Sequence, residues 1–118
     1  DSLVVVVDDD PLILELITGL LRCSGWSNLR SFTDPLKAKA FMAENAGQVR
    51  ALLTDFCMPG LDGLHLMDAA AQVPHKFLIS GDLMPGSLLY AECEKRGAVP
   101  VKKPFRSETI SNMLRQAA

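Results

Sequence analysis

The sequence has few of the features that mark specialised classes of protein. Its three cysteines, Cys23, Cys57 and Cys93, are odd in number and include no Cys-x-x-Cys pair, so we expect reduced thiols in a cytoplasmic protein. No apolar run approaches the roughly 18 residues of a membrane span, and no secretory signal pattern is present. The formal net charge of −2 favours neither nucleic acid nor an anionic membrane as a direct partner.

What remains is the composition of an ordinary soluble domain. The chain has 118 residues, of which 48% are hydrophobic and 22% are charged, and this is enough for one domain (1–118) with its own core. The sequence begins with Asp1 rather than Met. We therefore expect a piece of a longer polypeptide.

Apolar runs alternate with helix-like segments along the whole chain. Strands are predicted at residues 3–7, 28–32, 51–54, 76–80 and 98–102. Helices are predicted at about 11–24, 34–45, 62–72, 87–96 and 107–116. Regular alternation of this kind predicts an α/β fold, a doubly wound (βα)5 domain with a parallel sheet, right-handed crossovers and helices on both faces.

Two apolar stripes run along the first predicted helix. The spacing i, i+3, i+4, i+7 predicts that its sheet-facing side is formed by Ile13, Leu16, Ile17 and Leu20. A second stripe is predicted to be partly buried, or alternatively to be a docking surface; it is formed by Leu14, Thr18 and Leu21.

Charged and hydroxyl residues follow the central predicted strands at their carboxyl ends. Because these ends meet at one edge of a parallel sheet, we expect the following side chains to converge: Asp8, Asp9, Asp55, Ser80 and Lys103. Clustered carboxylates repel one another, and a hard divalent cation relieves that repulsion. The pattern therefore predicts a Mg²⁺ site, for which the backbone carbonyl of Cys57 is a plausible neutral ligand.

An ionised carboxylate beside a metal and a lysine suits phosphoryl transfer. The carboxylate attacks phosphorus without a general base and forms an aspartyl phosphate. Charge on the transferring group is then stabilised by positioned positive charge, which Mg²⁺, Lys103 and the Ser80 hydroxyl would supply.

These residues also carry a resemblance to a known family. The acidic pair Asp8-Asp9, the run Asp55-x-x-Met58-Pro59-x-x-Asp62-Gly63, Ser80 after an apolar strand, and Lys103-Pro104-Phe105 occur in the order and spacing of response regulator receiver domains. The chain resembles that family, to which the chemotaxis regulators of two-component systems belong, along essentially its whole length. The resemblance implies a flavodoxin-like fold with strand order 2-1-3-4-5.

The resemblance also implies roles. Asp55 would be the phosphoacceptor, Mg²⁺ (or Mn²⁺ in its place) would be held by Asp8, Asp9, Asp55 and the Cys57 carbonyl, and Ser80 and Lys103 would bind phosphoryl oxygens. The Lys103–Pro104 peptide would be cis. The phosphodonor would be a histidine kinase or a histidine phosphotransfer protein, and phosphorylation would change a protein-interaction surface. The domain would be a signalling domain rather than an enzyme, with no catalysis beyond its own phosphorylation and dephosphorylation.

Two departures from the family pattern concern signalling output. Three residues before the lysine, where the family usually has Tyr or Phe, this chain has Pro100. The loop after Ser80 is about two residues longer than is usual in the family, and it contains Pro85-Gly86. We therefore expect an atypical output face.

Two other interpretations fit part of the pattern. Asp8-x-Asp10 resembles the nucleophile and acid of haloacid-dehalogenase-type phosphohydrolases, although that scheme leaves Asp55 and the Met58-Pro59 turn unexplained. Asp10 before Pro11 also suits a helix cap. The missing aromatic is compatible with a receiver-like interaction module that is not phosphorylated.

Overall fold

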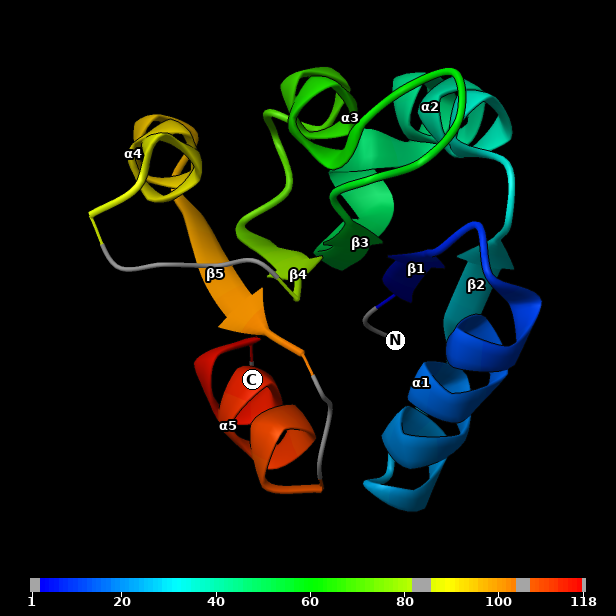
Figure 1. Cartoon of the computed structure of the whole chain (residues 1–118). Helices are drawn as coiled ribbons and strands as arrows, with labels where there is room; N and C mark the ends of the chain where they lie inside the picture. The colour runs from blue at the N-terminus through cyan, green and yellow to red at the C-terminus, as the bar shows by residue number, and fades with distance from the viewer. Residues whose placement is uncertain (1–2, 82–85, 104–106, 118) are drawn as a thin grey trace.

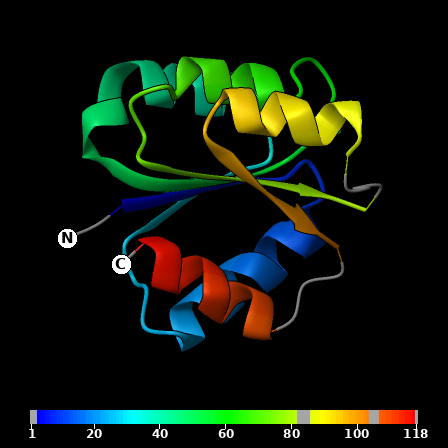
Figure 2. The same ribbon diagram turned by 90° about the vertical axis from the view of Figure 1, so that its left-hand side faces the viewer.

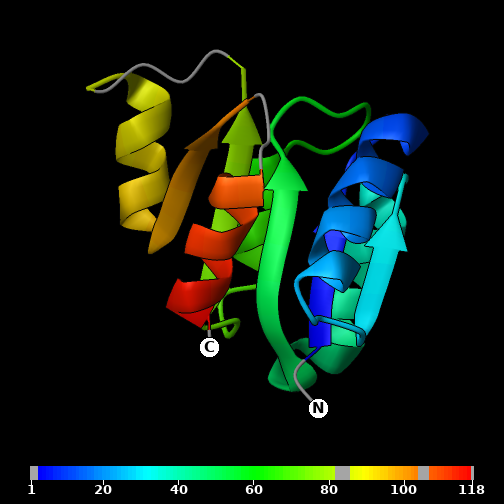
Figure 3. The same cartoon turned by 90° about the horizontal axis from the view of Figure 1, so that it is seen from below.

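The computed structural model describes residues 3–81, 86–103 and 107–117. Its centre is a five-stranded, wholly parallel sheet in the order β2-β1-β3-β4-β5, which confirms the predicted topology (Figure 1). The strands are β1 (Leu3–Val7), β2 (Leu29–Phe32), β3 (Val49–Asp55), β4 (His75–Ser80) and β5 (Ala98–Lys102). The arrowheads that are visible in Figure 3 point the same way, and because every strand pair is parallel, the carboxyl ends of the strands share one edge.

Helices cover both faces of the sheet. One face carries α1 (Pro11–Cys23) and α5 (Ser107–Ala117). The other carries α2 (Pro35–Asn45), α3 (Gly63–Ala69) and α4 (Leu88–Lys95), and a short 3-10 turn, η1 (Ala46–Gln48), follows α2 (Figure 2). None of the described helices is both long enough and apolar enough to cross a membrane.

The core has two layers because successive side chains of a strand point to opposite faces of a sheet. In β1, Val5 and Val7 pack into the layer under α2, α3 and α4, whereas Val4 and Val6 pack into the layer under α1 and α5. All four are at most 1% exposed. Burial on both faces explains why this strand is an unbroken apolar run, and it fixes where the acids that follow must lie.

The prediction of which side of α1 packs against the sheet is wrong, because the buried side is rotated about the helix axis by part of a turn from the predicted one. The residues that are buried against the sheet are Leu14, Ile17, Thr18 and Leu21. Leu16, predicted to face the core, is 49% exposed. The first stripe is the more apolar of the two, so periodicity alone favoured the wrong face. Tertiary packing selects the buried stripe, whose leucines lie in the same core layer as side chains of β1 and β3.

The third helix is shorter than predicted, since it ends at Ala69 rather than near Gln72. Beyond it, the N–H of Val73 donates to the carbonyl of Ala70 and closes a turn. Val73 is only 1% exposed and precedes Pro74, a position that disfavours helical backbone. Core packing of Val73 and the following proline together end the helix early.

Two predictions fall outside the described residues. They are the cis Lys103–Pro104 peptide and the details of the loop around residues 82–85. The residues that follow the 82–85 segment are described. Ser87 caps α4, and its hydroxyl accepts from the N–H of Tyr90 at 3.3 Å.

Candidate functional site

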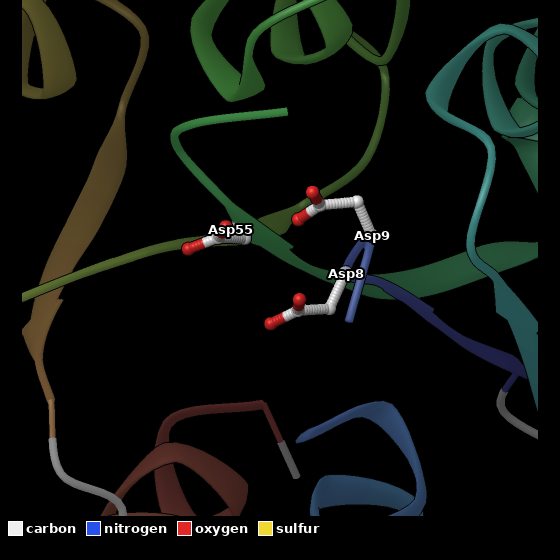
Figure 4. A group of neighbouring side chains, drawn as sticks. All are labelled: Asp8, Asp9 and Asp55. Carbon is white, nitrogen blue, oxygen red and sulfur yellow. The ribbon is translucent and has the colours of Figure 1, made fainter. Parts of the chain in front are cut away.

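Three carboxylates meet at the carboxyl edge of the sheet. Asp8 and Asp9 directly follow β1, and Asp55 is the last residue of the neighbouring strand β3. One oxygen from each lies within 4.8 Å of the others, and Figure 4 shows the three side chains converging from the two strand ends. Asp8 and Asp55 are buried and Asp9 is exposed, so the cluster opens to solvent on the side of Asp9.

Asp8 is the most constrained of the three acids. It is 1% exposed, and its Oδ1 accepts from the backbone N–H of Asp10 at 2.9 Å. Its Oδ2 is buried without a hydrogen-bond partner among the described residues. Burial raises the pKa of Asp8 and the neighbouring charges of Asp55 and Asp9 raise it further, against the opposing hydrogen bond from Asp10 and the charge of Lys103.

A lysine from a separate strand end completes the cluster. Lys103 follows β5, and its Nζ lies 3.0 Å from Oδ1 of Asp55. Burial of the amine favours its neutral form, but the hydrogen bond to Asp55 and the charges of Asp55, Asp8 and Asp9 outweigh burial and raise the pKa of Lys103. A backbone hydrogen bond holds Lys103 beside β4, because the N–H of Lys103 donates to the carbonyl of Ser80 at 3.0 Å.

Ser80 is the final residue of β4 and is 8% exposed. The N–H of Phe56 donates to the carbonyl of Ile79 at 3.1 Å, so the end of β4 lies directly beside the end of β3. Ser80 thus lies between the strand that ends in Asp55 and the strand followed by Lys103. The structure therefore gathers at one edge all five residues whose side chains were predicted to form the site.

The turn after Asp55 is held tightly against the sheet. The hydroxyl of Thr54 donates to the carbonyl of Asp55 at 2.9 Å, and the N–H of Gly63 donates to the carbonyl of Phe56 at 2.9 Å. A Cβ on Gly63 would lie 2.5 Å from the carbonyl oxygen of Asp55, so only glycine fits without displacement. Cys57 is exposed in this turn, and the role of its carbonyl as a metal ligand stays a prediction.

Two nearby acids have structural roles. Asp10 caps α1 by accepting from the N–H of Leu12 at 2.9 Å, as predicted, and this removes it from the cluster. Asp62 caps α3 by accepting from the N–H of His65, and its Oδ1 also lies 2.8 Å from Nδ1 of His65. The backbone N–H of Asp10 also orients Asp8, a role that was not predicted from the sequence, although a carboxylate two residues before a capping acid was an available signal.

The cluster suits a hard divalent cation. Such ions prefer carboxylate oxygens, and Mg²⁺ commonly takes one or two carboxylates together with waters and phosphate oxygens. The buried, unpartnered Oδ2 of Asp8 is an acceptor that a cation would satisfy. The donor set therefore fits the predicted metal. The amine of Lys103 lies beside one oxygen of Asp55 and adds a positive charge there.

Fold and site together define the class as a flavodoxin-like α/β domain with acids and a lysine at the carboxyl edge of its sheet. The chain belongs to the response regulator receiver domain family, whose profile matches residues 4–115. Receiver domains are signalling domains of two-component systems.

Relatives and solved structures agree with this assignment. The response regulator protein TmoT of Ectopseudomonas mendocina is 30% identical over 99% of this chain and 53% of its own length. The transcriptional regulatory protein FixJ of Bradyrhizobium diazoefficiens is 33% identical over 95% of this chain and 54% of its own. The chain thus spans about half the length of these two relatives.

Among solved structures, the receiver domain of the hybrid histidine kinase CckA is similar, with a TM-score of 0.78 and 25% identity over 98% of both chains. The chemotaxis protein CheY4 of Vibrio cholerae has the same fold, with a TM-score of 0.82 over 99% of this chain and 98% of its own, at 20% identity.

Proposed function

We propose that this domain accepts a phosphoryl group on Asp55 in a Mg²⁺-dependent reaction and thereby switches a protein-interaction surface. The observation that carries the proposal is the arrangement around Asp55: two further carboxylate oxygens within 4.8 Å and the Lys103 amine at 3.0 Å. The phosphodonor class is a phosphohistidine on a histidine kinase or a phosphotransfer protein. Family membership and the presence of every expected site residue support this choice.

In this scheme, Asp8, Asp9, Asp55 and the Cys57 carbonyl hold the metal. Bound Mg²⁺ supplies positive charge that offsets the repulsion between these carboxylates and the incoming phosphoryl oxygens. Lys103 is already charged at neutral pH, because its raised pKa keeps the proton on Nζ. It balances charge on the side of Asp55 that faces β5.

The transfer itself needs few groups. An oxygen of Asp55 forms the new bond to phosphorus while the bond from phosphorus to the donor nitrogen breaks, and that electron pair stays on the imidazole. Asp55 is ionised beforehand, so no base removes a proton. Lys103 and the Ser80 hydroxyl are positioned to bind phosphoryl oxygens and stabilise the charge that spreads over them.

Signal output is proposed to be atypical. Pro100 lies half-buried in β5 opposite Leu78, and it has neither an aromatic ring nor the freedom of side-chain rotation on which the usual switch depends. We infer that phosphorylation acts through the segment from Gly86 into α4, whose first residue, Leu88, is 85% exposed.

The proposal is tested by incubating the domain with a small phosphoramidate donor, with and without Mg²⁺. Stoichiometric, Mg²⁺-dependent labelling that is lost in Asp55→Asn is expected, while Glu44→Gln, which removes an exposed acid of α2, retains it. Absence of labelling in the wild type would favour a receiver-like module that is not phosphorylated. Rapid turnover of a phosphomonoester would favour a phosphohydrolase.

A further inference from the structure

Lys76 is a buried cation that the phosphoryl site does not use. It is the second residue of β4 and is only 7% exposed, although lysine is almost never buried without a partner. Its Nζ makes one long hydrogen bond, 3.4 Å to the carbonyl of Val73. Among the described residues no carboxylate forms an ion pair with it. An ammonium group in this environment requires further acceptors.

Lys76 also lines a small cavity. A space of about 260 Å³ is lined by Met67, Asp68, Ala71, Lys76, Lys95 and Arg96. It lies between the C-terminal ends of α3 and α4, which are neighbours on one face of the sheet (Figures 1 and 2). Lys76 is four residues before Ser80, so the cavity is about 13 Å along the strand from the proposed phosphoryl site.

The lining has more N–H donors than acceptors. Arg96 uses four of its five donors within the described structure, on Asp68 and Glu92. Lys95 uses one of three, on Glu92, and Lys76 uses one of three. Arg96 and Lys95 therefore share the carboxylates of Asp68 and Glu92, Lys76 pairs with neither, and five N–H donors of the three side chains have no partner among the described residues.

The helix ends do not neutralise this excess. Carbonyls at helix C-termini usually attract cations, but here many already accept hydrogen bonds. The N–H groups of Ala70, Arg96 and Gly97 donate to the carbonyls of Met67, Cys93 and Glu94, respectively, and Nη1 of Arg96 donates to the carbonyl of Glu92.

We propose that this cavity binds a small phosphate-type oxyanion, held by Lys76, Lys95 and the remaining N–H of Arg96. The volume is below the roughly 300 Å³ at which drug-sized sites begin, so it suits a small anion rather than a nucleotide. Because Arg96 also joins α4 to Asp68 of α3, a bound anion would compete with Asp68 for the guanidinium. This site is independent of the proposed phosphorylation of Asp55.

The test is a titration of the isotope-labelled domain with inorganic phosphate, at constant ionic strength and without Mg²⁺, followed by amide chemical shifts. Saturable shifts are expected at Ala71, Lys76 and Arg96, with none at Ser80. Lys76→Met should weaken binding at least about tenfold, because it removes a charge-assisted contact. Lys39→Met, an exposed lysine of α2, should bind phosphate as the wild type does.

A second variant and a second anion, acetate, keep the result unambiguous. Lys95→Gln should weaken phosphate binding about threefold, and it leaves the buried strand intact, so it serves if Lys76→Met fails to fold. The proposal is overturned by unchanged affinity in a folded Lys76→Met, by shifts that rise linearly and equally in the Lys39→Met control, by shifts confined to Ser80, or by acetate binding more tightly than phosphate.

Discussion

At the scale of single residues, the acids of the site differ in a way that the sequence could not reveal. Asp8 and Asp9 are adjacent and chemically identical, yet Asp8 is 1% exposed and Asp9 is exposed. Strand pattern and topology predicted that both lie at the carboxyl edge. Which one is buried depends on how the chain leaves β1, where the N–H of Asp10 draws Asp8 inward.

Replacement of Asp8 by Asn should stabilise the metal-free protein at neutral pH. The pKa of Asp8 is raised by burial, so its contribution to stability is fully present below its unfolded-state pKa and is lost as pH rises through the folded-state pKa. At pH 7 the charged form is therefore a cost. The expected gain is about 1 kcal/mol, or about 4 °C in melting temperature.

The gain should shrink as the pH approaches 3.8, the ordinary pKa of an aspartate side chain. Thermal melts of both proteins between about pH 3.5 and 8, without divalent cations, check this. Saturating Mg²⁺ should raise the melting temperature of the wild type by several degrees and that of the variant much less. A less stable variant at neutral pH would contradict this account of Asp8.

Lys103→Met should separate metal binding from phosphoryl transfer. Loss of a cation 3.0 Å from Asp55 leaves a more negative cluster, so Mg²⁺ affinity should rise about fivefold. Phosphorylation from a small donor should slow at least about 100-fold, since the charge that stabilises the transferring group is gone.

Lys102→Met is the matched control for this variant, because Lys102 is the exposed neighbour in β5. It should change neither quantity appreciably. Mg²⁺ affinity is measured by titration calorimetry and transfer by the rate of acyl phosphate formation. Weaker Mg²⁺ binding in Lys103→Met would show that the lysine organises the cluster rather than balancing its charge.

At the scale of elements, the sequence predicted some strand limits well, both for β1, which is buried along its length, and for β5, an edge strand with exposed residues. The limits of β1 and β5 were predicted to the residue, whereas β3 begins two residues earlier than predicted and α3 ends three residues earlier. For α1, apolar periodicity favoured a stripe that is partly exposed, and tertiary packing buries a neighbouring one. The burial of Lys76 was likewise hidden in a strand whose limits were predicted almost correctly.

Gly63→Ala should destabilise the protein through the join between β3 and α3. The new Cβ would lie 2.5 Å from the carbonyl of Asp55 and 2.7 Å from Cδ1 of Leu78. Displacement of these groups should cost about 2–3 kcal/mol and should slow phosphorylation, because it moves the backbone of the acceptor residue.

Gly19→Ala provides the contrast for Gly63→Ala. Gly19 lies inside α1, where a new Cβ would have nothing within 4 Å, so this change should stabilise the protein by up to about 1 kcal/mol. Urea denaturation of both variants measures the two effects. Equal effects in the two variants would refute the close approach at Gly63.

At the scale of the whole molecule, the sheet topology brings together residues that no local sequence pattern connects. It brings residues from four separate strand ends, 95 positions apart at the extreme, to one edge, as Asp8 and Lys103 show. The sequence predicted this convergence because alternation of strands and helices requires a parallel sheet. It could not predict distances, the unpartnered oxygen of Asp8 or the cavity beside Lys76, since these depend on side-chain packing.

A phosphoryl mimic should displace the start of α4 in the intact domain. With Pro100 in place of an aromatic residue, we expect Mg²⁺ and beryllium fluoride to shift the backbone amides of residues 86–90 more than that of Val99. Asp55→Asn should show no such shift. Amide chemical shifts report the change directly, and an undisturbed α4 would mean that output leaves the domain by another route.

The most direct test of the central claim locates the acyl phosphate in the chain. Reduction of the phosphorylated domain with borohydride converts a phosphorylated aspartate to homoserine, which peptide mass spectrometry assigns to one position. The account predicts conversion at Asp55, dependent on Mg²⁺ and undetectable at Asp8 and Asp9. Conversion at Asp8 in place of Asp55 would contradict it.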